Sequence, residues 1–517
     1  MNHDIDYYNP YPSFQPGQAE AINQMLSALD DGRKVVELNA PTASGKSLDL
    51  YVLGLVLSKE LDMDKTIYST PLVSLVDQLG YTKEFSNMPI LKGKRNYLCN
   101  LVPSIMADDC PFKNFGDALV YCKQERDDEE CKPCKDCLYQ KDRARFKASK
   151  FGATTFARYL VDPACHSNCR ALLIDESAGL EKTLVDWSTL KLPATIDKHH
   201  LRSSVVAYNQ ELMEQIKALE KKLAGNCMKN SGDLQNASEL QKNLNRLNRE
   251  SAKCHKIIHH IDSEHKYFLD SEMRFRLLEG KSEFSEMIEH LDFVVLASGT
   301  PTTGIYCDDF QQINIQHPIP IASRLIHYIP IGSMAYKERQ ATAPKMAAMI
   351  EKLHAKSHKK TMVHCGAYNI ARMLYDNMTR EGRKIAILQD QKDREASKTR
   401  FLSCSEGIFL SVAYSEGLDL KGEEYPLNII AKVPFENIGD EFIKARNAND
   451  NYKRYNLFAA VEVMQAAGRC TRTVSDFSDT YILDESWKQF FGRSRKLFPS
   501  WFTAALKSHN SVLEDFA

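Results

Sequence analysis

Neither sign of charge dominates this sequence, and it has no apolar run long enough to cross a membrane. Its 517 residues include 67 Lys and Arg against 68 Asp and Glu, which gives a formal net charge of −1. Near neutrality excludes binding to nucleic acid through a globally basic chain, so any such contact must use local basic surface. A membrane span takes roughly 20 apolar residues, and the amino terminus also lacks a basic-then-apolar secretory signal. We therefore expect no membrane contact and a cytoplasmic location.

The length of the chain excludes a single hydrophobic core. A sequence of 517 residues predicts roughly two to four domains, each large enough to bury a core of its own. Alternating apolar strands and helices recur along it, which is typical of parallel α/β sheets with functional sites at the carboxyl ends of strands. The fold class predicted is therefore α/β.

A phosphate-binding loop is the strongest local pattern. The apolar run 35–38 is followed by Ala40-Pro-Thr-Ala-Ser-Gly-Lys-Ser47 and then by a helix-like stretch over 48–57. Strand, glycine turn and helix in that order are what a P-loop requires. Lys46 is expected to reach the β/γ-phosphates of a nucleotide, and the Ser47 hydroxyl to ligate Mg²⁺. The backbone of Ala43, Ser44 and Gly45 would surround the phosphates.

Three further residues fit nucleotide chemistry. Gln18 opens a short helix ahead of the P-loop, and its planar amide can both donate to and accept from an adenine edge. A solvated helix-start glutamine is the alternative. Asp175 and Glu176 end the apolar strand 170–174, so Asp175 is expected to hold Mg²⁺ through water and Glu176 to deprotonate the attacking water.

Six of the 14 cysteines crowd into one insertion, at Cys99, Cys110, Cys122, Cys131, Cys134 and Cys137. Several thiolates in one segment of a protein without a secretory signal indicate a metal site, and their spacing suits either zinc or an iron–sulfur cluster. Unliganded buried cysteines are the alternative. The region from about 190 to 290 is predicted to be a charged, all-helical insertion. Its pairs His199-His200 and His259-His260 are not expected to bind metal, because no ligands stand nearby at fixed spacing.

A second α/β domain is predicted from about residue 330. It has five strand candidates and no P-loop, and the segment 415–419 contains Glu416 and Asp419. Gln465, Arg469 and Arg472 follow at i, i+4 and i+7, which predicts one face of a helix. Arginines aimed together need an anionic partner, so we expect them to act as arginine fingers on a γ-phosphate. Exposed arginines on a surface helix are the alternative.

Taken in order, these motifs resemble those of the XPD-like iron–sulfur helicases, which include DinG. The resemblance covers Gly17-Gln18, Gly45-Lys46-Ser47, 93–99, Asp175-Glu176, 416–419 and 465–472, and the most specific part is the cysteine insertion from Asn96-Tyr-Leu-Cys99 to Cys137-Leu-Tyr139. It implies two RecA-like motor domains, a cysteine-rich domain holding a four-iron four-sulfur (4Fe-4S) cluster, a helical arch, and 5′-to-3′ DNA unwinding driven by ATP and Mg²⁺. The compact chain is similar to phage or plasmid members.

The resemblance implies specific boundaries and partners. Motor domain 1 is expected over 1–90, 151–188 and 291–325, the iron–sulfur domain over 91–150, the arch over 189–290, and motor domain 2 over 326–517. Cys99 and Cys137 match the cluster ligands best, Cys110 and Cys134 come next, and Cys131 and Cys122 are replacements. Single-stranded and forked DNA are the expected partners of a monomeric motor.

One departure bears on function. Where the family usually has Asp-Glu-Ala-His, this chain has Asp175-Glu176-Ser177-Ala178, so the histidine thought to connect hydrolysis with DNA is missing. Two alternatives therefore stay open: a helicase for RNA or RNA–DNA hybrids, whose backbones motor motifs also track, and an ATP-dependent binding switch that does not unwind.

Overall fold

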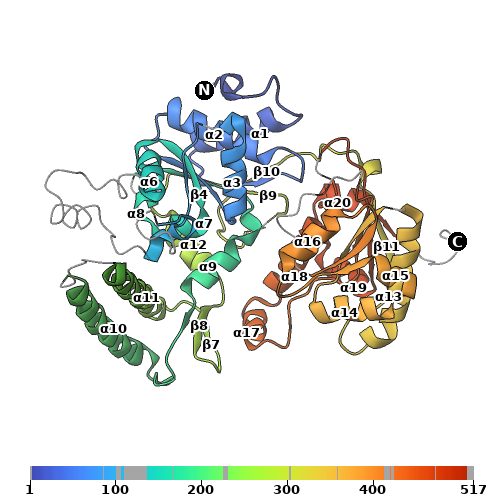
Figure 1. The fold of residues 1–517 in the computed structure, drawn as a ribbon. Helices are drawn as coiled ribbons and strands as arrows, with labels where there is room; N and C mark the ends of the chain where they lie inside the picture. The colour runs from blue at the N-terminus through green and yellow to red at the C-terminus, as the bar shows by residue number, and fades with distance from the viewer. Residues whose placement is uncertain are drawn as a thin grey trace. The chain divides into compact units, whose positions relative to one another are not determined.

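Two parallel α/β sheets form the framework of the protein (Figure 1), in agreement with the predicted fold class. The computed structural model describes residues 3–85, 87–99, 106–109, 137–166, 168–224, 231–301, 304–357, 359–412, 420, 424–471 and 473–508. Each of the two sheets has seven strands, and a third, smaller sheet has three. The domain boundaries predicted above stay predictions.

The first sheet has the strand order β10-β1-β9-β5-β2-β4-β3. Its strands are β1 (Val35–Asn39), β2 (Thr66–Thr70), β3 (Ile90–Leu91), β4 (Phe151–Thr155), β5 (Ala171–Ile174), β9 (Phe293–Ser298) and β10 (Gln311–Asn314). Strands β1, β2, β5 and β9 are buried along their whole length, which is why their apolar sequences predicted them. Strands β3, β4 and β10 were not predicted, because they are short or rich in small and polar residues.

Helices connect these strands. They are α1 (Gln18–Asp30), α2 (Lys46–Lys59), α3 (Val73–Tyr81), α6 (Leu138–Ala148), α7 (Phe156–Val161), α8 (Pro163–His166) and α9 (Leu180–Ser188). Helix α1 buries Ile22, Met25 and Leu26, the apolar positions that predicted it. Helix α2 buries most of its length, because both of its faces carry apolar residues. The first turn of α2, which contains Lys46 and Ser47, is therefore held in place by the packing of the rest of the helix.

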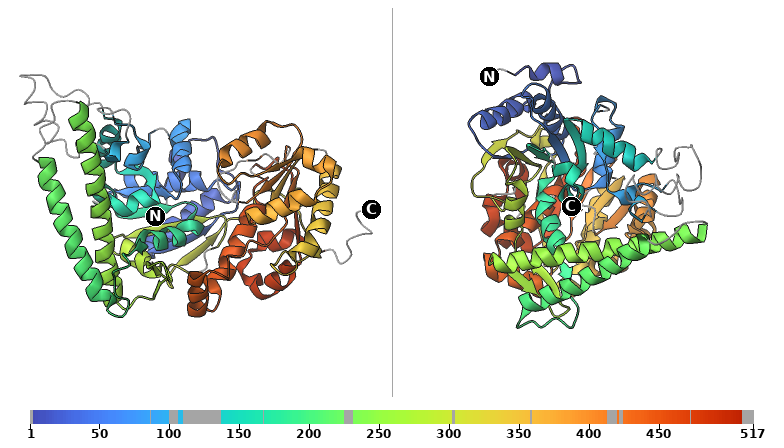
Figure 2. Two further views of the ribbon diagram at one scale, coloured as in Figure 1. Left: turned by 60° about the horizontal axis from the view of Figure 1, so that its bottom comes forward. Right: turned by 90° about the vertical axis from the view of Figure 1, so that its left-hand side faces the viewer.

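The insertion between β5 and β9 is built on two long helices, α10 (Leu201–Ala224) and α11 (Ser231–Asp262), which pack side by side (Figure 2). Their shared core includes Val205, Leu212, Leu247 and Ile257. The expectation of an all-helical insertion is wrong. A three-stranded antiparallel sheet of β6 (Leu190–Lys191), β8 (Arg274–Leu277) and β7 (Tyr267–Leu269) closes this core before the short helix α12 (Lys281–Ile288). Phe275 and Leu277, alternate residues of β8, are buried there.

The second sheet has the order β13-β14-β12-β15-β16-β11-β17, and its strand pairs are parallel. Its strands are β11 (Ile326–Gly332), β12 (Lys360–His364), β13 (Ala386–Leu388), β14 (Gly407–Ser411), β15 (Leu427–Ile430), β16 (Asp479–Asp484) and β17 (Leu506–Ser508). All five predicted strands are confirmed, and β11 and β17 are additional.

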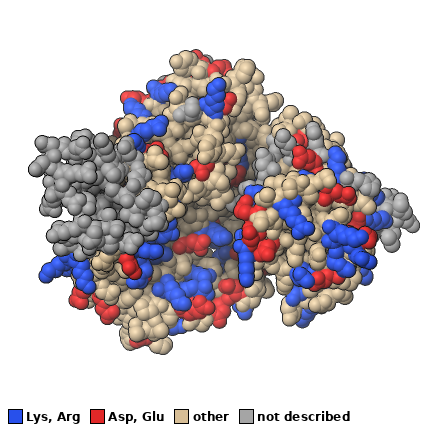
Figure 3. Space-filling view, viewed as in Figure 1, with Lys and Arg blue, Asp and Glu red and all other residues tan. Residues whose placement is uncertain are grey.

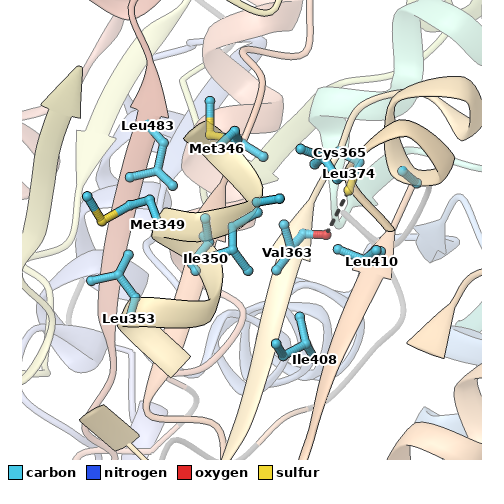
Figure 4. Packing of buried hydrophobic residues seen from close by; sticks show 14 of the residues in the cluster. Met346, Met349, Ile350, Leu353, Val363, Cys365, Leu374, Ile408, Leu410 and Leu483 are labelled. Atoms are coloured by element: carbon cyan, nitrogen blue, oxygen red, sulfur yellow. Dashed lines mark hydrogen bonds between the residues drawn. The ribbon is translucent and has the colours of Figure 1, made fainter. Parts of the chain in front are cut away.

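Helices cover both faces of this sheet. They are α13 (Arg339–Ser357), α14 (Tyr368–Asn377), α15 (Arg380–Ile385), α16 (Arg394–Ser403), α17 (Glu441–Asp450), α18 (Lys453–Ala467), α19 (Ser486–Ser494) and α20 (Ser500–Ala505). On one face, Met346, Met349, Ile350 and Leu353 form an i, i+3, i+4, i+7 stripe of α13 that packs onto the strands (Figure 4). Helices α18, α19 and α20 contribute to a second cluster around Trp487.

The surface carries both signs of charge. On the face drawn in Figure 3, Lys and Arg side chains are interspersed with Asp and Glu. This mixture agrees with the formal net charge of −1. In the part of the chain that the structure describes, no helix combines the length and apolarity of a membrane span.

Candidate nucleotide-binding site

The predicted P-loop is a turn with two left-handed residues. The backbone of Ala43 has a φ of 69° and that of Gly45 a φ of 82°. Successive N–H groups in such a turn point into one concavity that suits an anion. Helix α2 begins directly afterwards, so Lys46 and Ser47 lie in its first turn, at the positive end of its dipole. Both side chains are partly buried, and that of Ser44 is buried.

Gln18 braces the P-loop from α1. Its side-chain Nε2 donates to the carbonyl of Gly45 at 3.2 Å and to Oδ1 of Asp49 at 2.7 Å. Its Oε1 accepts from the backbone N–H of Gln15 at 2.7 Å, and the side chain is 1% exposed. Both polar atoms of the amide are thus engaged with protein groups. Adenine recognition by Gln18 stays a prediction and would require some of these bonds to be exchanged.

The same contact explains why residue 45 is glycine. A Cβ at Gly45 would lie 2.4 Å from Nε2 of Gln18, and the positive φ would strain any other residue as well. Asp49, the carboxylate that fixes this amide, is fully buried three residues after Lys46. Asp49 was not predicted from the sequence, although an acid in the first turn of the P-loop helix is a usable signal.

The turn after β9 lies against the P-loop. The backbone N–H of Ala40 donates to the carbonyl of Ser298 at 2.9 Å, and a Cβ at Gly299 would lie 3.8 Å from Nζ of Lys46. Ser298 and Thr300 are buried, with their hydroxyl oxygens 3.2 Å apart. The segment 298–300 is therefore a neighbour of the phosphate-binding turn.

The acidic pair follows β5. The backbone N–H of Asp175 donates to the carbonyl of Ser69 at 2.8 Å, which extends the β2–β5 pairing by one residue. Its Oδ1 accepts from the backbone N–H of Glu176 at 2.9 Å, and its Oδ2 accepts from the hydroxyl of Tyr68 at 2.6 Å. Asp175 is only 7% exposed, so these donors fix the carboxylate in one orientation. Glu176 has a φ of 53°, a left-handed backbone that turns its side chain out of the strand direction.

Tyr68 was not found from the sequence. It lies in β2 and is 1% exposed. In sequence it looks like any aromatic strand residue, and only the pairing of β2 with β5 brings its hydroxyl to Asp175. The available signal, a tyrosine within a strand, is too common to single it out.

The prediction that Gln465 and Arg469 share one face of a helix is wrong, and Arg472 lies outside the described part of the chain. Helix α18 ends at Ala467, where the N–H of Gly468 makes the last helical bond, to the carbonyl of Met464 at 3.1 Å. Gln465 therefore lies in the last turn of the helix, whereas Arg469 lies in the turn that follows and is 6% exposed. Gly468 follows the helix with a right-handed φ of −83°, and the chain then turns toward β16.

A polar network lies beneath that turn. The amide of Asn428 donates from Nδ2 to the carbonyl of Ala466 at 2.7 Å, and its Oδ1 lies 2.9 Å from Nε2 of His364. Burial lowers the pKa of His364 to about 4; the bond to Asn428 opposes this shift, and the charge of Arg469 adds to it. His364 is therefore neutral at neutral pH, so that no second cation is buried near Arg469. Neither His364 nor Asn428 was predicted from the sequence as a site residue.

Comparison with known proteins adds to this geometry. Residues 350–505 match the family model described as helicase C-terminal domain. A search of curated proteins finds no match. A solved structure titled XPD helicase aligns over 96% of this chain and 100% of its own, with a TM-score of 0.61 at 13% identity. Xpd4 of S. tokodaii aligns over 96% of this chain and 100% of its own, with a TM-score of 0.57 at 14% identity.

The chain has the fold of an XPD-like helicase. At such identities the likeness shows the fold, and together with the family model it supports an ATP-dependent nucleic-acid helicase. Within this XPD-like fold, Ser177 and Ala178 form the short 3-10 turn after the acidic pair, and both are buried. The position where the family usually has its histidine is thus occupied by a small buried side chain.

The two ends of the cysteine insertion are anchored to each other. The rings of Tyr97 and Tyr139 lie 5.5 Å apart, and the Tyr97 hydroxyl donates to Asp142 at 3.0 Å. Cys99 is buried two residues after Tyr97, and Cys137 is partly buried at the start of α6. These contacts hold the two flanks of the insertion together. Several predicted site residues lie outside the described part of the chain: Cys110, Cys122, Cys131, Cys134, Glu416, Asp419 and Arg472.

Proposed function

We propose that this chain is an ATP-dependent 5′-to-3′ DNA helicase or translocase. One observation carries the proposal: in a single parallel sheet, a P-loop follows β1 and an acidic pair follows β5, with only β9 between these strands. Because parallel strands end at one edge, this order supports a shared nucleoside triphosphate site there. The match of residues 350–505 to a helicase C-terminal domain supports a motor built on this site.

ATP and Mg²⁺ fit the residues at this edge. The turn with Ala43 and Gly45 at positive φ presents N–H groups to an anion, and α2 adds the positive end of its dipole. Lys46 would neutralise the β/γ-phosphates, while Ser47 and Asp175 would hold the metal ion, which stabilises charge on the phosphates when bound. Glu176 would orient the attacking water and accept its proton. Tyr68 and the N–H of Glu176 keep the carboxylate of Asp175 correctly turned.

The second α/β domain supplies cations in this proposal. Arg469 and Arg472 would stabilise negative charge that develops on the γ-phosphate, with Gln465 assisting, and Glu416 and Asp419 would contribute to the nucleotide site. Hydrolysis would then depend on closure of the two motor domains. Single-stranded DNA would be held mainly through its phosphates, so binding should weaken as the salt concentration rises.

The cysteine insertion is proposed to hold a 4Fe-4S cluster through four of its six cysteines, Cys99 and Cys137 among them. The anchoring of Tyr97 against Tyr139 supports this, because it brings together the segments that carry these two cysteines. A cluster would stiffen a polar segment that can bury little apolar surface of its own, and the stiff segment would act as the wedge that splits the duplex.

Unwinding assays test the proposal directly. Forked and tailed duplexes with a 5′ or a 3′ overhang, made as DNA, RNA and RNA–DNA hybrid, would be incubated with the protein and ATP. We expect unwinding of DNA with a 5′ overhang and little with a 3′ overhang. Preferential unwinding of RNA or hybrid would replace the proposed substrate, and 3′-overhang unwinding would overturn the polarity.

One specific observation favours a second function, an ATP-dependent binding switch. It is the buried pair Ser177-Ala178 where the family usually has Ala-His. A switch would hydrolyse ATP with little stimulation by single-stranded DNA and would not separate strands. Many-fold stimulation of ATP hydrolysis by single-stranded DNA, together with unwinding, would exclude it.

Removal of a cluster ligand tests the wedge. We expect Cys99→Ser to lose the visible absorbance of an iron–sulfur cluster and strand separation, while DNA-stimulated ATP hydrolysis persists in part. Cys404→Ser changes a partly buried cysteine directly after α16; it is the matched control and should keep all three. Colourless wild-type protein with stoichiometric zinc after anaerobic purification would contradict the cluster. Full unwinding by the bleached variant would contradict the wedge.

A further inference from the structure

Five ionisable side chains gather where the long helix α11 ends and α12 lies beside it. His259 and His260 occupy the last turn of α11, and His265 lies in the loop that leads to β7. Glu283 and Glu286 are one turn apart on α12. The chain thus brings together three separate segments, none of which shows a ligand spacing in the sequence.

Glu283 determines which nitrogen of His260 carries a proton. Nε2 of His260 lies 2.7 Å from Oε1 of Glu283, and Nζ of Lys256 donates to Oε2 of the same carboxylate at 2.5 Å. The side chains of His260 and Glu283 are 0% and 3% exposed. A carboxylate offers only acceptors, so Nε2 of His260 must be the donor. In the neutral imidazole, Nδ1 then presents a lone pair.

That lone pair faces a second imidazole nitrogen. Nδ1 of His260 and Nδ1 of His265 are 3.0 Å apart. Two imidazole ligands of one tetrahedral zinc ion, with Zn–N bonds of about 2.0–2.1 Å, place their nitrogens about 3.3 Å apart. A change of a few tenths of an ångström would therefore admit the ion between them. The donation from a ligand histidine to a buried carboxylate is also the usual outer arrangement of zinc sites.

Glu286 supplies a third ligand atom. One ligand atom each from His260, His265 and Glu286 lie within 4.8 Å of one another. Oε1 of Glu286 also lies 2.8 Å from Nε2 of His259, and this contact orients the carboxylate. Its side chain is 42% exposed and His265 is partly buried, so an ion has a path from solvent.

We propose that His260, His265 and Glu286 bind a divalent transition-metal ion, zinc in the first place, with a water molecule in the fourth position. Two imidazoles and one carboxylate suit zinc and exclude calcium or magnesium, which prefer oxygen ligands. The ion fastens the end of α11, the following loop and α12 to one another. It acts as a clip at one end of the helical insertion and takes no part in ATP chemistry.

This proposal departs from the expectation that the pair His259-His260 would not bind metal. That expectation followed from the absence of nearby ligands in the sequence. Folding supplies them, because α12 returns to the end of α11 after the hairpin of β7 and β8. The pair His199-His200, by contrast, is exposed, and His200 pairs with Asp197 of its own turn.

Zinc titration of the full-length protein tests the site. Calorimetry and metal analysis would compare wild type with His265→Gln/Glu286→Gln, both of whose side chains are at least partly exposed, so the fold should survive. His199→Gln/His200→Gln is the matched control, since it removes two histidines of the same insertion. All three proteins keep every cysteine, so zinc bound by thiolates is the same in each. Titration with Co²⁺ adds the visible spectrum of a nitrogen and oxygen site.

We expect wild type and the control to bind one more equivalent of zinc than His265→Gln/Glu286→Gln, and zinc to raise the melting temperature of the first two only. Glu283→Gln should weaken zinc binding about 10- to 100-fold, the usual effect of an outer partner. Equal zinc stoichiometry and affinity in wild type and His265→Gln/Glu286→Gln would overturn the proposal and leave a hydrogen-bonded histidine pair only.

Discussion

The two large sheets use the same strand, turn and helix units and differ in the turns. In the first sheet, six residues connect β1 to α2, and Gly45 with a φ of 82° precedes Lys46 and Ser47. In the second sheet, three residues connect β12 to α14, and Gly366 with a φ of 71° precedes Ala367 and Tyr368. Both turns thus use a left-handed glycine before a helix. Only the first has the length and the lysine to hold a phosphate chain.

The difference indicates that the turn residues determine whether phosphate can be bound. Both turns follow a strand of a parallel sheet, so the sheet itself does not distinguish them. The first turn is supported by two buried side chains: the amide of Gln18 binds both the carbonyl of Gly45 and the carboxylate of Asp49. In the second domain, the uncharged pair of His364 and Asn428 supports the end of α18, next to Arg469. We infer that the first sheet supplies binding and the second supplies a positioned cation.

The largest effect is expected from Lys46→Ala, which removes the charge opposite the β/γ-phosphates. ATP hydrolysis should fall to background, while DNA binding largely remains, and a phosphate-release assay with a DNA-binding titration measures both. Lys59→Ala, an exposed lysine at the other end of α2, is the matched control. Near-wild-type turnover by a folded Lys46→Ala protein would contradict the proposal that the P-loop of the first sheet binds the ATP that is hydrolysed.

Arg469→Ala tests the second sheet. If the guanidinium acts only in the transition state, kcat should fall on the order of 10³-fold with little change in nucleotide affinity. The same is expected of Arg472→Ala. Arg372→Ala, an exposed arginine of α14, should leave turnover unchanged. A change in KM alone would mean that these arginines only help to bind ATP, and the contrast between the two sheets would weaken.

Tyr68→Phe sharpens the account of the acidic pair. It deletes one hydrogen bond to Asp175, and a bond to a charged group contributes about 1.5–3 kcal/mol, so we expect kcat to fall roughly 10- to 150-fold and the Mg²⁺ requirement to rise. Steady-state kinetics at varied Mg²⁺ measures this. The control is Tyr51→Phe, whose ring stacks on Phe85 at 4.3 Å. Unchanged Mg²⁺ dependence would leave Tyr68 a purely structural residue.

The smallest effect concerns pH. Burial holds the pKa of His364 at about 4 against an ordinary value of 6.5, so the unfolded chain takes up this proton first as the pH falls. The stability associated with the neutral ring is fully present above pH 6.5 and is lost progressively as the pH falls toward 4, with a slope of at most about one proton.

Urea unfolding across this pH window checks the linkage. His364→Gln should show a shallower loss of stability than wild type between these two pH values. His200→Gln, at an exposed histidine, should show the same loss as wild type. Identical slopes for His364→Gln and wild type would show that His364 does not titrate differently in the two states.

Much of the framework could be predicted because its signals are local. The strand over 35–38, the glycine turn and the helix with Lys46 stand within about one supersecondary unit, and buried strands such as β5 and β9 are almost entirely apolar runs. The helix through Arg469 was predicted wrongly because i, i+4 spacing continues formally past Gly468, whereas the chain turns there. The sheet of β6, β8 and β7 was missed because its strands are two to four residues long.

By itself, therefore, the sequence determined the strand–turn–helix units, the residues of the phosphate turn and the acidic pair, since each depends on neighbours along the chain. Only the tertiary structure decided which strands lie side by side, that Tyr68 meets Asp175, that Gln18 braces Gly45, and that His260 meets His265 and Glu286. These contacts join segments tens to more than a hundred residues apart or depend on the exact path of a turn. No pattern along the chain encodes them, because they are selected by how apolar faces pack when the whole domain folds.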